Sequence, residues 1–363
     1  MAPVRLGDPV RIGSVTAKNR ICIPPMVMFH RAGQEGMTVP FHVEHYTRLA
    51  RGGPGLIIQE ATCVSPEGRL SEDQLGIWSD AHVPGLRKIV EAVHREGAPI
   101  FLQLHHAGIM AWGERKLCPG DYTCTYKPTN RGQPLADQPV TVRGEMLSTE
   151  DVARLKQAFI DGGRRAHQAG YDGVELHGCH SYLLCQFLNK NVNNRDDQYR
   201  DALLLIREIF QGIRAVTSPE FVIGIRLGAF EPALSDGIAH AKALTEMGLQ
   251  FLDVSYGFSG EMDLTAPGNP DFSGAVRGAA AIAEAVSIPV FAVDGIRTPA
   301  QAEAILAETV VSMTDVGRSA LVDPDWPKKA LAGEAPGKCL GCSTCQWRID
   351  PGRCPGKRLL EAK

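Results

Sequence analysis

Two histidines and one tyrosine lie close together near the middle of the chain, as His177, His180 and Tyr182. They directly follow a short apolar run that is typical of a β-strand. An imidazole N–H can donate a hydrogen bond to an electron-rich substrate atom, and a phenol can deliver a proton. A lone histidine is more often structural, but this pair followed by a tyrosine at a strand end predicts an active site.

Four of the ten cysteines crowd the C-terminal region, as Cys339, Cys342, Cys345 and Cys354. The first three recur at every third position and can surround one centre, and the fourth is followed by proline, as in ferredoxin-like [4Fe–4S] segments. Four thiolates suit tetrahedral Zn²⁺ equally well. Without an export signal, disulfides are the weaker interpretation. The sequence therefore predicts a metal or cluster site, with [4Fe–4S] and Zn²⁺ as alternatives.

The composition is that of a globular protein without a strong charge bias. The 363 residues include 38 Lys plus Arg against 41 Asp plus Glu, for a formal charge of −3, and 44% are hydrophobic. The basic surplus of most nucleic-acid-binding proteins is missing. No apolar run reaches the roughly 18 to 20 residues of a membrane span, and the first residues lack the apolar core of a secretory signal. We therefore expect a cytoplasmic protein with neither nucleic acid nor membrane as partner.

Short β-branched runs alternate with longer amphipathic stretches along most of the chain. We expect eight strands, over Ile21–Pro24, Gly55–Glu60, Ile100–His105, Gly173–His177, Phe221–Leu227, Phe251–Ser255, Val290–Val293 and Val311–Val316. Helical patterns follow most of them. The helix before the fourth strand is the clearest, because Ser148 and Asp151 suit its start and Gly170 suits its end.

This alternation favours an α/β fold, the (β/α)8 TIM barrel, over an open doubly wound sheet, because no Gly-rich phosphate turn follows the first strand. We assign residues 1–330 to the barrel. A long irregular insert after the third strand, residues 107–147, is expected to cap the catalytic mouth. Residues 331–363 are expected to form a small cysteine-rich subdomain that binds the metal or cluster.

In such a barrel the chemistry lies at the carboxyl ends of the strands. The last two predicted strands are followed by Gly295 and by Gly317-Arg318. Glycines let backbone N–H groups approach a phosphate closely, and Arg318 adds positive charge. Arg226 stands on an apolar strand, where a buried guanidinium needs an anionic or electron-rich partner. A phosphate-bearing ligand is therefore implied.

Six segments follow one another along the barrel in a recognisable order: KNRICIPPM, GLIIQEATCVSPEGR, FLQLHHAG, GYDGVELHGCHSYLLCQFLN, FAVDGI and DVGRSALVDPDWP. In this order they resemble the old yellow enzyme family of FMN-dependent ene-reductases, over roughly residues 1–330. The resemblance implies an FMN whose phosphate lies near Gly295, Gly317 and Arg318. It places the flavin ring against Pro25, Met26 and Ala61, with the pyrimidine edge read by Gln103 and Arg226.

The same resemblance implies the reaction. His177 and His180 would bind the carbonyl oxygen of a small α,β-unsaturated substrate while hydride passes from flavin N5 to the β carbon. Tyr182 would protonate the α carbon from the opposite face. NAD(P)H is a possible electron donor. Val27 stands where many relatives have Thr or Cys to hydrogen-bond the flavin, so the redox potential is expected to differ.

The cysteine quartet resembles that of a subgroup similar to dienoyl-CoA reductase and trimethylamine dehydrogenase, which carries a [4Fe–4S] cluster just after the barrel. The intervals before the third and fourth cysteines are shorter here than is usual in that subgroup. Nucleotide-binding domains that usually follow are also missing from this sequence. With a cluster, we expect electrons from a partner protein or separate subunit; with Zn²⁺, direct reduction by NAD(P)H. We expect a homo-oligomer.

Other functions compete with this interpretation. The same barrel could work in the oxidative direction, as a flavin dehydrogenase, a desaturase or an amine dehydrogenase. It could also be an electron-transfer subunit of a larger complex. A tRNA-modifying flavin enzyme is disfavoured. That class has a basic face and a dedicated cysteine acid, whereas this chain has balanced charge and the pattern of His177, His180 and Tyr182.

Overall fold

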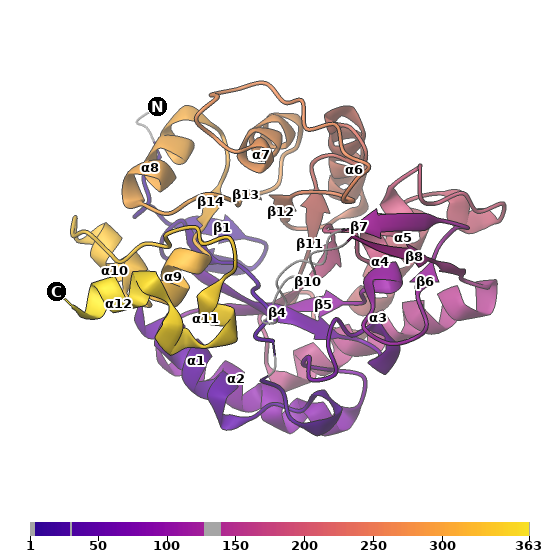
Figure 1. Cartoon of the computed structure of the whole chain (residues 1–363), viewed down its shortest axis with the longest axis horizontal. Helices are drawn as coiled ribbons and strands as arrows, with labels where there is room; N and C mark the ends of the chain where they lie inside the picture. The colour runs from indigo at the N-terminus through magenta and orange to yellow at the C-terminus, as the bar shows by residue number, and fades with distance from the viewer. Residues whose placement is uncertain (1–3, 30, 127–138, 363) are drawn as a thin grey trace.

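The computed structural model describes residues 4–29, 31–126 and 139–362. Eight parallel strands close into a barrel in the order β10-β11-β12-β13-β14-β3-β4-β5 (Figure 1). They are β3 (Ile21–Ile23), β4 (Leu56–Cys63), β5 (Ile100–His105), β10 (Gly173–Gly178), β11 (Val222–Gly228), β12 (Leu252–Ser255), β13 (Val290–Ala292) and β14 (Met313–Asp315). The eight predicted strands and the (β/α)8 fold are confirmed, with ends that coincide or differ by at most three residues.

Helices surround the barrel, and their apolar faces pack on its outside. They are α1 (Pro40–Arg51), α2 (Val83–Arg95), α3 (Thr149–Ala169), α4 (Leu183–Leu188), α5 (Leu204–Val216), α6 (Leu234–Met247), α7 (Gly274–Ala285), α8 (Pro299–Glu308), α9 (Arg318–Val322) and α10 (Trp326–Leu331). The predicted limits of α3 are confirmed. Ser148 Oγ accepts a hydrogen bond from the N–H of Asp151, and Gly170 ends the helix with φ +96°.

A hairpin that the sequence patterns did not reveal precedes the barrel. Its strands β1 (Val10–Ile12) and β2 (Val15–Ala17) pair antiparallel. Ile12 and Ala17 belong to a separate apolar cluster with three barrel phenylalanines, whose rings stack in the order Phe101, Phe251, Phe291 at centroid distances of 5.4 and 5.1 Å. This cluster fills the barrel interior with packed side chains, so the fold has no pore.

The insert after β5 is more regular than its composition indicates. It contains a short helical turn, Gly108–Met110, and strands β6 (Leu117–Cys118), β7 (Thr123–Tyr126), β8 (Val140–Arg143) and β9 (Glu145–Met146). β7 pairs with β8, and β6 pairs with β9. Residues 127–138, which belong to the predicted cap, lie outside the described residues. The description of the insert as irregular is therefore wrong for the strands at its two ends.

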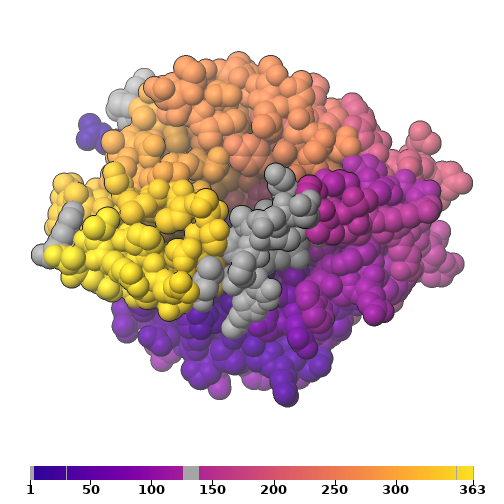
Figure 2. Space-filling model, in the orientation of Figure 1, coloured from indigo at the N-terminus to yellow at the C-terminus, as the bar shows by residue number. Residues whose placement is uncertain are grey.

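The C-terminal tail, residues 332–362, carries the short helices α11 (Gln346–Ile349) and α12 (Pro355–Glu361). It lies against α9 and α1 and appears in yellow on one face of the molecule (Figure 2). Asp323, at the end of α9, accepts a hydrogen bond from the N–H of Gly337 at 2.8 Å. Among the described residues, no helix is both long enough and apolar enough to cross a membrane.

Candidate active site

The histidine pair lies at the end of β10 and in the turn that joins it to α4. His177 is the fifth residue of β10, and Tyr182 immediately precedes α4. His180 and Ser181 have positive φ angles of 59° and 65°, a conformation that residues other than glycine rarely adopt. Strained backbone of this kind persists only where the surrounding structure enforces it, and it is concentrated at functional sites. Here it brings the His180 ring back towards His177.

Hydrogen bonds hold the two predicted histidines in one row with a third. His177 Nε2 lies 3.2 Å from His180 Nδ1, and His177 Nδ1 lies 3.0 Å from His105 Nδ1 at the end of β5. His180 Nε2 lies 2.7 Å from Ser255 Oγ at the end of β12. Three strands of the barrel therefore fix the orientation of the imidazole rings.

Tyr182 packs against this row. Its ring centroid lies 4.7 Å from that of His177 and 4.6 Å from that of His105, both edge to face. It lies 6.3 Å from the ring of His180. The structure thus brings together all three residues predicted to be catalytic, and it adds His105, whose position at a strand end was its only signal in the sequence.

Burial disfavours the protonated form of two imidazoles in this row, those of His177 and His180. Burial, and then the nearby His105, His180 and Arg226, hold the pKa of His177 well below its usual value. Burial and Arg226 lower the pKa of His180 to about 3. A neutral imidazole has one N–H donor and one acceptor nitrogen. The row can therefore pass hydrogen bonds along itself, and it can donate to an electron-rich atom that displaces the contact between His177 and His180.

A cavity opens beside this row at the carboxyl ends of β3, β13 and β14. Six of the eight predicted cofactor residues line it: Pro25, Met26, Arg226, Gly295, Gly317 and Arg318. The other two lie in the adjacent strands. Ala61 is buried in β4, where its carbonyl accepts a hydrogen bond from Gln74, and Gln103 in β5 donates to Glu175 Oε1 at 2.7 Å.

Two glycines shape the floor of the cavity. Gly295 has φ +75°, and a Cβ added there would meet no protein atom within 4 Å, so its backbone faces open space. A Cβ on Gly317 would lie 3.2 Å from Met26 Sδ. With the Arg318 guanidinium beside them, these backbones form a site that an anion such as a phosphate can approach closely.

The tail also contributes to the cavity. Cys339 and Arg348 line it together with Gly317 and Arg318. The Arg348 guanidinium lies over the Phe29 ring at 5.6 Å, and burial lowers its pKa. The sequence analysis did not predict a role for Arg348. Its only signal was its place between the third and fourth cysteines.

The predicted metal ligands lie in different environments. Cys354 is buried, Cys342 is exposed, and the N–H of Cys339 donates to Ser319 Oγ at 3.2 Å. Within the described ranges, one set of three ligand atoms lies within 4.8 Å of one another, and it comes from His177, Cys179 and His180. The cysteine sulfurs do not reach that closeness in this structure.

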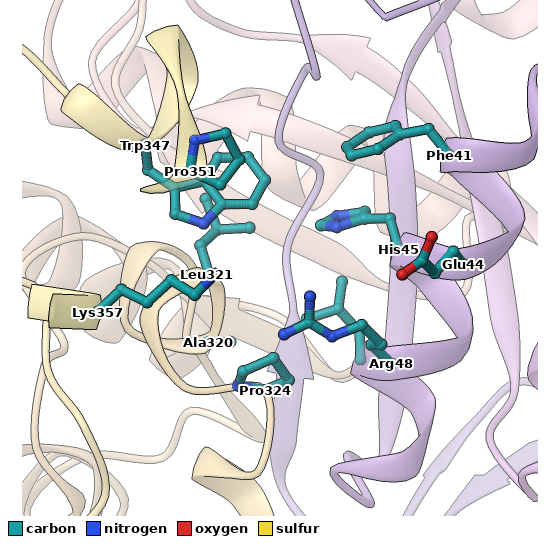
Figure 3. Close-up of a pocket in the computed structure, with 11 residues that line it drawn as sticks. Phe41, Glu44, His45, Arg48, Ala320, Leu321, Pro324, Trp347, Pro351 and Lys357 are labelled. Carbon is teal, nitrogen blue, oxygen red and sulfur yellow. The ribbon is translucent and has the colours of Figure 1, made fainter. Parts of the chain in front are cut away.

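A second pocket separates the tail from α1. Figure 3 shows Trp347 facing His45 across it, and their ring centroids lie 5.7 Å apart. Arg48 and Lys357 reach its edges from the two sides. This pocket lies outside the histidine row, and it marks where the tail rests on the barrel.

Comparisons with known proteins agree with this geometry. The sequence profile of the NADH:flavin oxidoreductase / NADH oxidase family matches residues 5–335. An NADPH dehydrogenase of Bacillus licheniformis is 33% identical over 339 residues, covering 91% of this chain and 95% of its own. An NADH oxidase of Thermoanaerobacter brockii is 35% identical over 351 residues, covering 92% of this chain; our chain spans 52% of that protein's length.

Solved structures support the fold. The old yellow enzyme homologue from Zymomonas mobilis superimposes with a TM-score of 0.75 at 24% identity, covering 95% of this chain and 99% of its own. The family match over residues 5–335 and these relatives together identify the family of this chain. The chain belongs to the NADH:flavin oxidoreductase / NADH oxidase family, the old yellow enzyme family of FMN-dependent oxidoreductases.

Proposed function

We propose that this enzyme reduces an activated C=C bond, as in an α,β-unsaturated carbonyl compound, with electrons that originate from NAD(P)H or a partner protein. The observation that carries the proposal is the row of buried histidines beside Tyr182 at the edge of an anion-binding cavity. Neutral N–H donors suit a carbonyl oxygen, because they can stabilise the negative charge that develops on it.

The cavity residues fit FMN. The open backbone at Gly295, the close approach at Gly317 and the cation of Arg318 suit its phosphate. Pro25 and Met26 offer an apolar wall for the ring, and Arg226 offers a buried cation for the pyrimidine edge. When bound, FMN supplies the two reducing electrons; the protein supplies position and electrostatics.

The chain's own residues then have separate roles. His177 and His180 orient the substrate when its carbonyl oxygen displaces their contact with each other and accepts hydrogen bonds from them. Tyr182 stands next to them and delivers the proton that the α carbon needs. His105 holds the His177 ring through the contact between their Nδ1 atoms.

Replacing Tyr182 by Phe tests this assignment. The variant should retain FMN and accept electrons from NAD(P)H, but its turnover with an activated enone should fall by about 10²-fold or more, the usual contribution of a positioned acid. Unchanged enone turnover would mean that the proton comes from another group. A protein that binds no FMN, even after reconstitution, would overturn the whole proposal.

We further propose that the tail carries a [4Fe–4S] cluster rather than Zn²⁺. Cys339 lines the same cavity as Gly317 and Arg318, so a redox centre there would lie next to the flavin. A single Zn²⁺ would hold its four sulfurs about 4 Å from one another, because each Zn–S bond is about 2.3 Å. No three of the four cysteine sulfurs lie within 4.8 Å of one another among the described residues, and this wider spacing favours the larger cluster. Iron, sulfide and zinc assays on anaerobically purified protein distinguish the two. We also propose that a separate protein donates electrons to this enzyme and that the enzyme forms a homo-oligomer.

A further inference from the structure

Three carboxyl groups and one guanidinium meet inside the barrel below the cavity. Glu175, Asp253 and Asp315 come from β10, β12 and β14, and Arg226 comes from β11. Their exposed fractions are 0%, 0%, 2% and 4%. Arg226 and Asp315 also line the cavity itself. The sequence pattern pointed to Arg226 alone and did not predict this carboxyl cluster.

The three carboxyl groups face one another and the guanidinium. Arg226 Nε lies 3.3 Å from Asp253 Oδ2, and Asp253 lies between the carboxyls of Glu175 and Asp315. Gln103 donates to one oxygen of Glu175. Apart from the ion pair with Arg226 and the carboxyl groups themselves, no N–H or hydroxyl group of the described residues donates to the other oxygen of Glu175 or to either oxygen of the two aspartates.

This arrangement places three potential negative charges against one positive charge in a buried site. Two carboxylate oxygens repel each other unless a proton lies between them, and an uncompensated buried charge is strongly unfavourable. The lowest-energy state is therefore electroneutral, with one carboxylate paired to Arg226 and two carboxylic acids. In agreement, burial raises the pKa of Glu175, Asp253 and Asp315.

The other groups that face the cluster do not change charge near neutral pH. They are Cys22 on β3, and Cys179 and His177 at the end of β10. Burial raises the pKa of both thiols well above its usual value and lowers that of the imidazole. Arg226 keeps its proton, since the carboxyls outweigh burial and raise its pKa. Only the carboxyl groups are left to exchange a proton.

We propose that this cluster stores two protons at rest and takes up one more when negative charge arrives at the cavity face of Arg226. Asp253, the carboxylate that contacts Arg226, is the group that becomes protonated. The proposal rests on the proposed function for the identity of that charge, which is the FMN reduced to its anionic form. The balance is two electrons from the donor, one proton onto the flavin and one proton from solvent onto Asp253. Charge inside the barrel is thereby conserved.

The resting state is tested without the cofactor. Infrared spectra of the apoprotein at neutral pH, in H₂O and in D₂O, report carboxylic acids through their C=O band. We expect Asp315→Asn to lose one such band and to leave the carboxylate bands unchanged. Glu231→Gln calibrates the loss of one acid band, because Glu231 is an equally buried acid outside the cluster, accepts hydrogen bonds from Cys185 and Asn189, and has a pKa that burial raises to about 8. Loss of a carboxylate band in Asp315→Asn would overturn the proposal.

Proton uptake is tested in the FMN-loaded protein. Its reduction potential is followed against pH in mildly alkaline buffer, with free FMN as reference. We expect two protons per two electrons in the wild type, in Asp315→Asn, in Glu231→Gln and in Asp253→Asn, because in Asp253→Asn a remaining carboxyl group of the cluster becomes the carboxylate beside Arg226. We expect one proton in the triple variant Glu175→Gln/Asp253→Asn/Asp315→Asn, which has no carboxyl group left in the cluster. One proton in the wild type, or two in the triple variant, would contradict the assignment. If the wild type bound no FMN, the proposed function would fail, while the infrared test would still decide whether the protons are stored.

Discussion

His105 and His177 face each other across neighbouring strands, with their Nδ1 atoms 3.0 Å apart. Because only one of the two Nδ1 atoms can donate along this line, the proton position on His105 decides which nitrogen of His177 carries its proton. His105 is therefore a positioning residue for the substrate-binding histidines.

Replacing His105 by Phe should weaken the binding of a carbonyl-mimicking phenol by about fivefold, since a lost hydrogen bond of this kind is worth about 1 kcal/mol. The measurement is a titration of the FMN absorption band with the phenol. His167→Phe is the control, because His167 lies on α3 and contacts Phe221, away from the cavity. Equal affinity in His105→Phe and wild type would remove His105 from the site.

Gly295 and Gly53 offer a matched pair for the phosphate site. Both have nearly the same positive φ, 75° and 76°, and an added Cβ would meet nothing within 4 Å at either position. Each change to Ala should therefore destabilise the fold by about 1 kcal/mol. Only Gly295→Ala puts a methyl group into the cavity, so only this variant should bind FMN more weakly. A similar loss in Gly53→Ala would mean that strain alone is responsible.

Two histidines outside the active site should change stability with pH in opposite directions. Burial lowers the pKa of His42 to about 4, so the unfolded chain binds a proton there between about pH 6.5 and 4 and the native state does not. The contribution of His42 to the free energy of unfolding is therefore complete above the pKa of histidine in the unfolded chain, and it is lost as pH falls towards the pKa of the native state. Between pH 7 and pH 5, His42→Gln should lose about 1 to 2 kcal/mol less than the wild type in urea unfolding.

His94 is the counterpart. Its hydrogen bond and ion pair with Asp172, at 2.9 Å, raise its pKa. Its contribution is therefore present below the unfolded pKa and disappears as pH rises through the raised value. His94→Gln should steepen the loss of stability on acidification, whereas His42→Gln should flatten it. The same direction for both variants would contradict this assignment.

The sequence predicts those parts of the molecule that depend on local pattern. The β-branched run at Ile100–His105 and the Ser148 cap with Gly170 gave a strand and a helix within narrow limits. The spacing of His177, His180 and Tyr182 brought them together because all three lie in one turn. Asp253 and Asp315 carried no such signal, since their proximity depends on barrel closure between segments about sixty residues apart in sequence.

Arg348 is the clearest case of a site residue that the sequence could not reveal. Its guanidinium reaches the cavity only because the tail folds back over α9 and α1. There it lies near Glu60, whose pKa burial raises to about 8 even though Met28, Tyr46 and Arg348 all lower it. The tail is therefore part of the cavity wall.

Replacing Arg348 by Met should keep the contact with the Phe29 ring and remove the positive charge. We expect the affinity of the apoprotein for FMN, an anion, to fall by about tenfold or more, as for loss of a charge-assisted contact of about 1.5 kcal/mol or more. Arg353→Met is the control, since Arg353 lies on the same tail but is exposed. Fluorescence titration of both apoproteins with FMN gives the comparison. If the two variants bind FMN equally well, the charge of Arg348 does not act on the cavity, and its role is to pack the tail against Phe29.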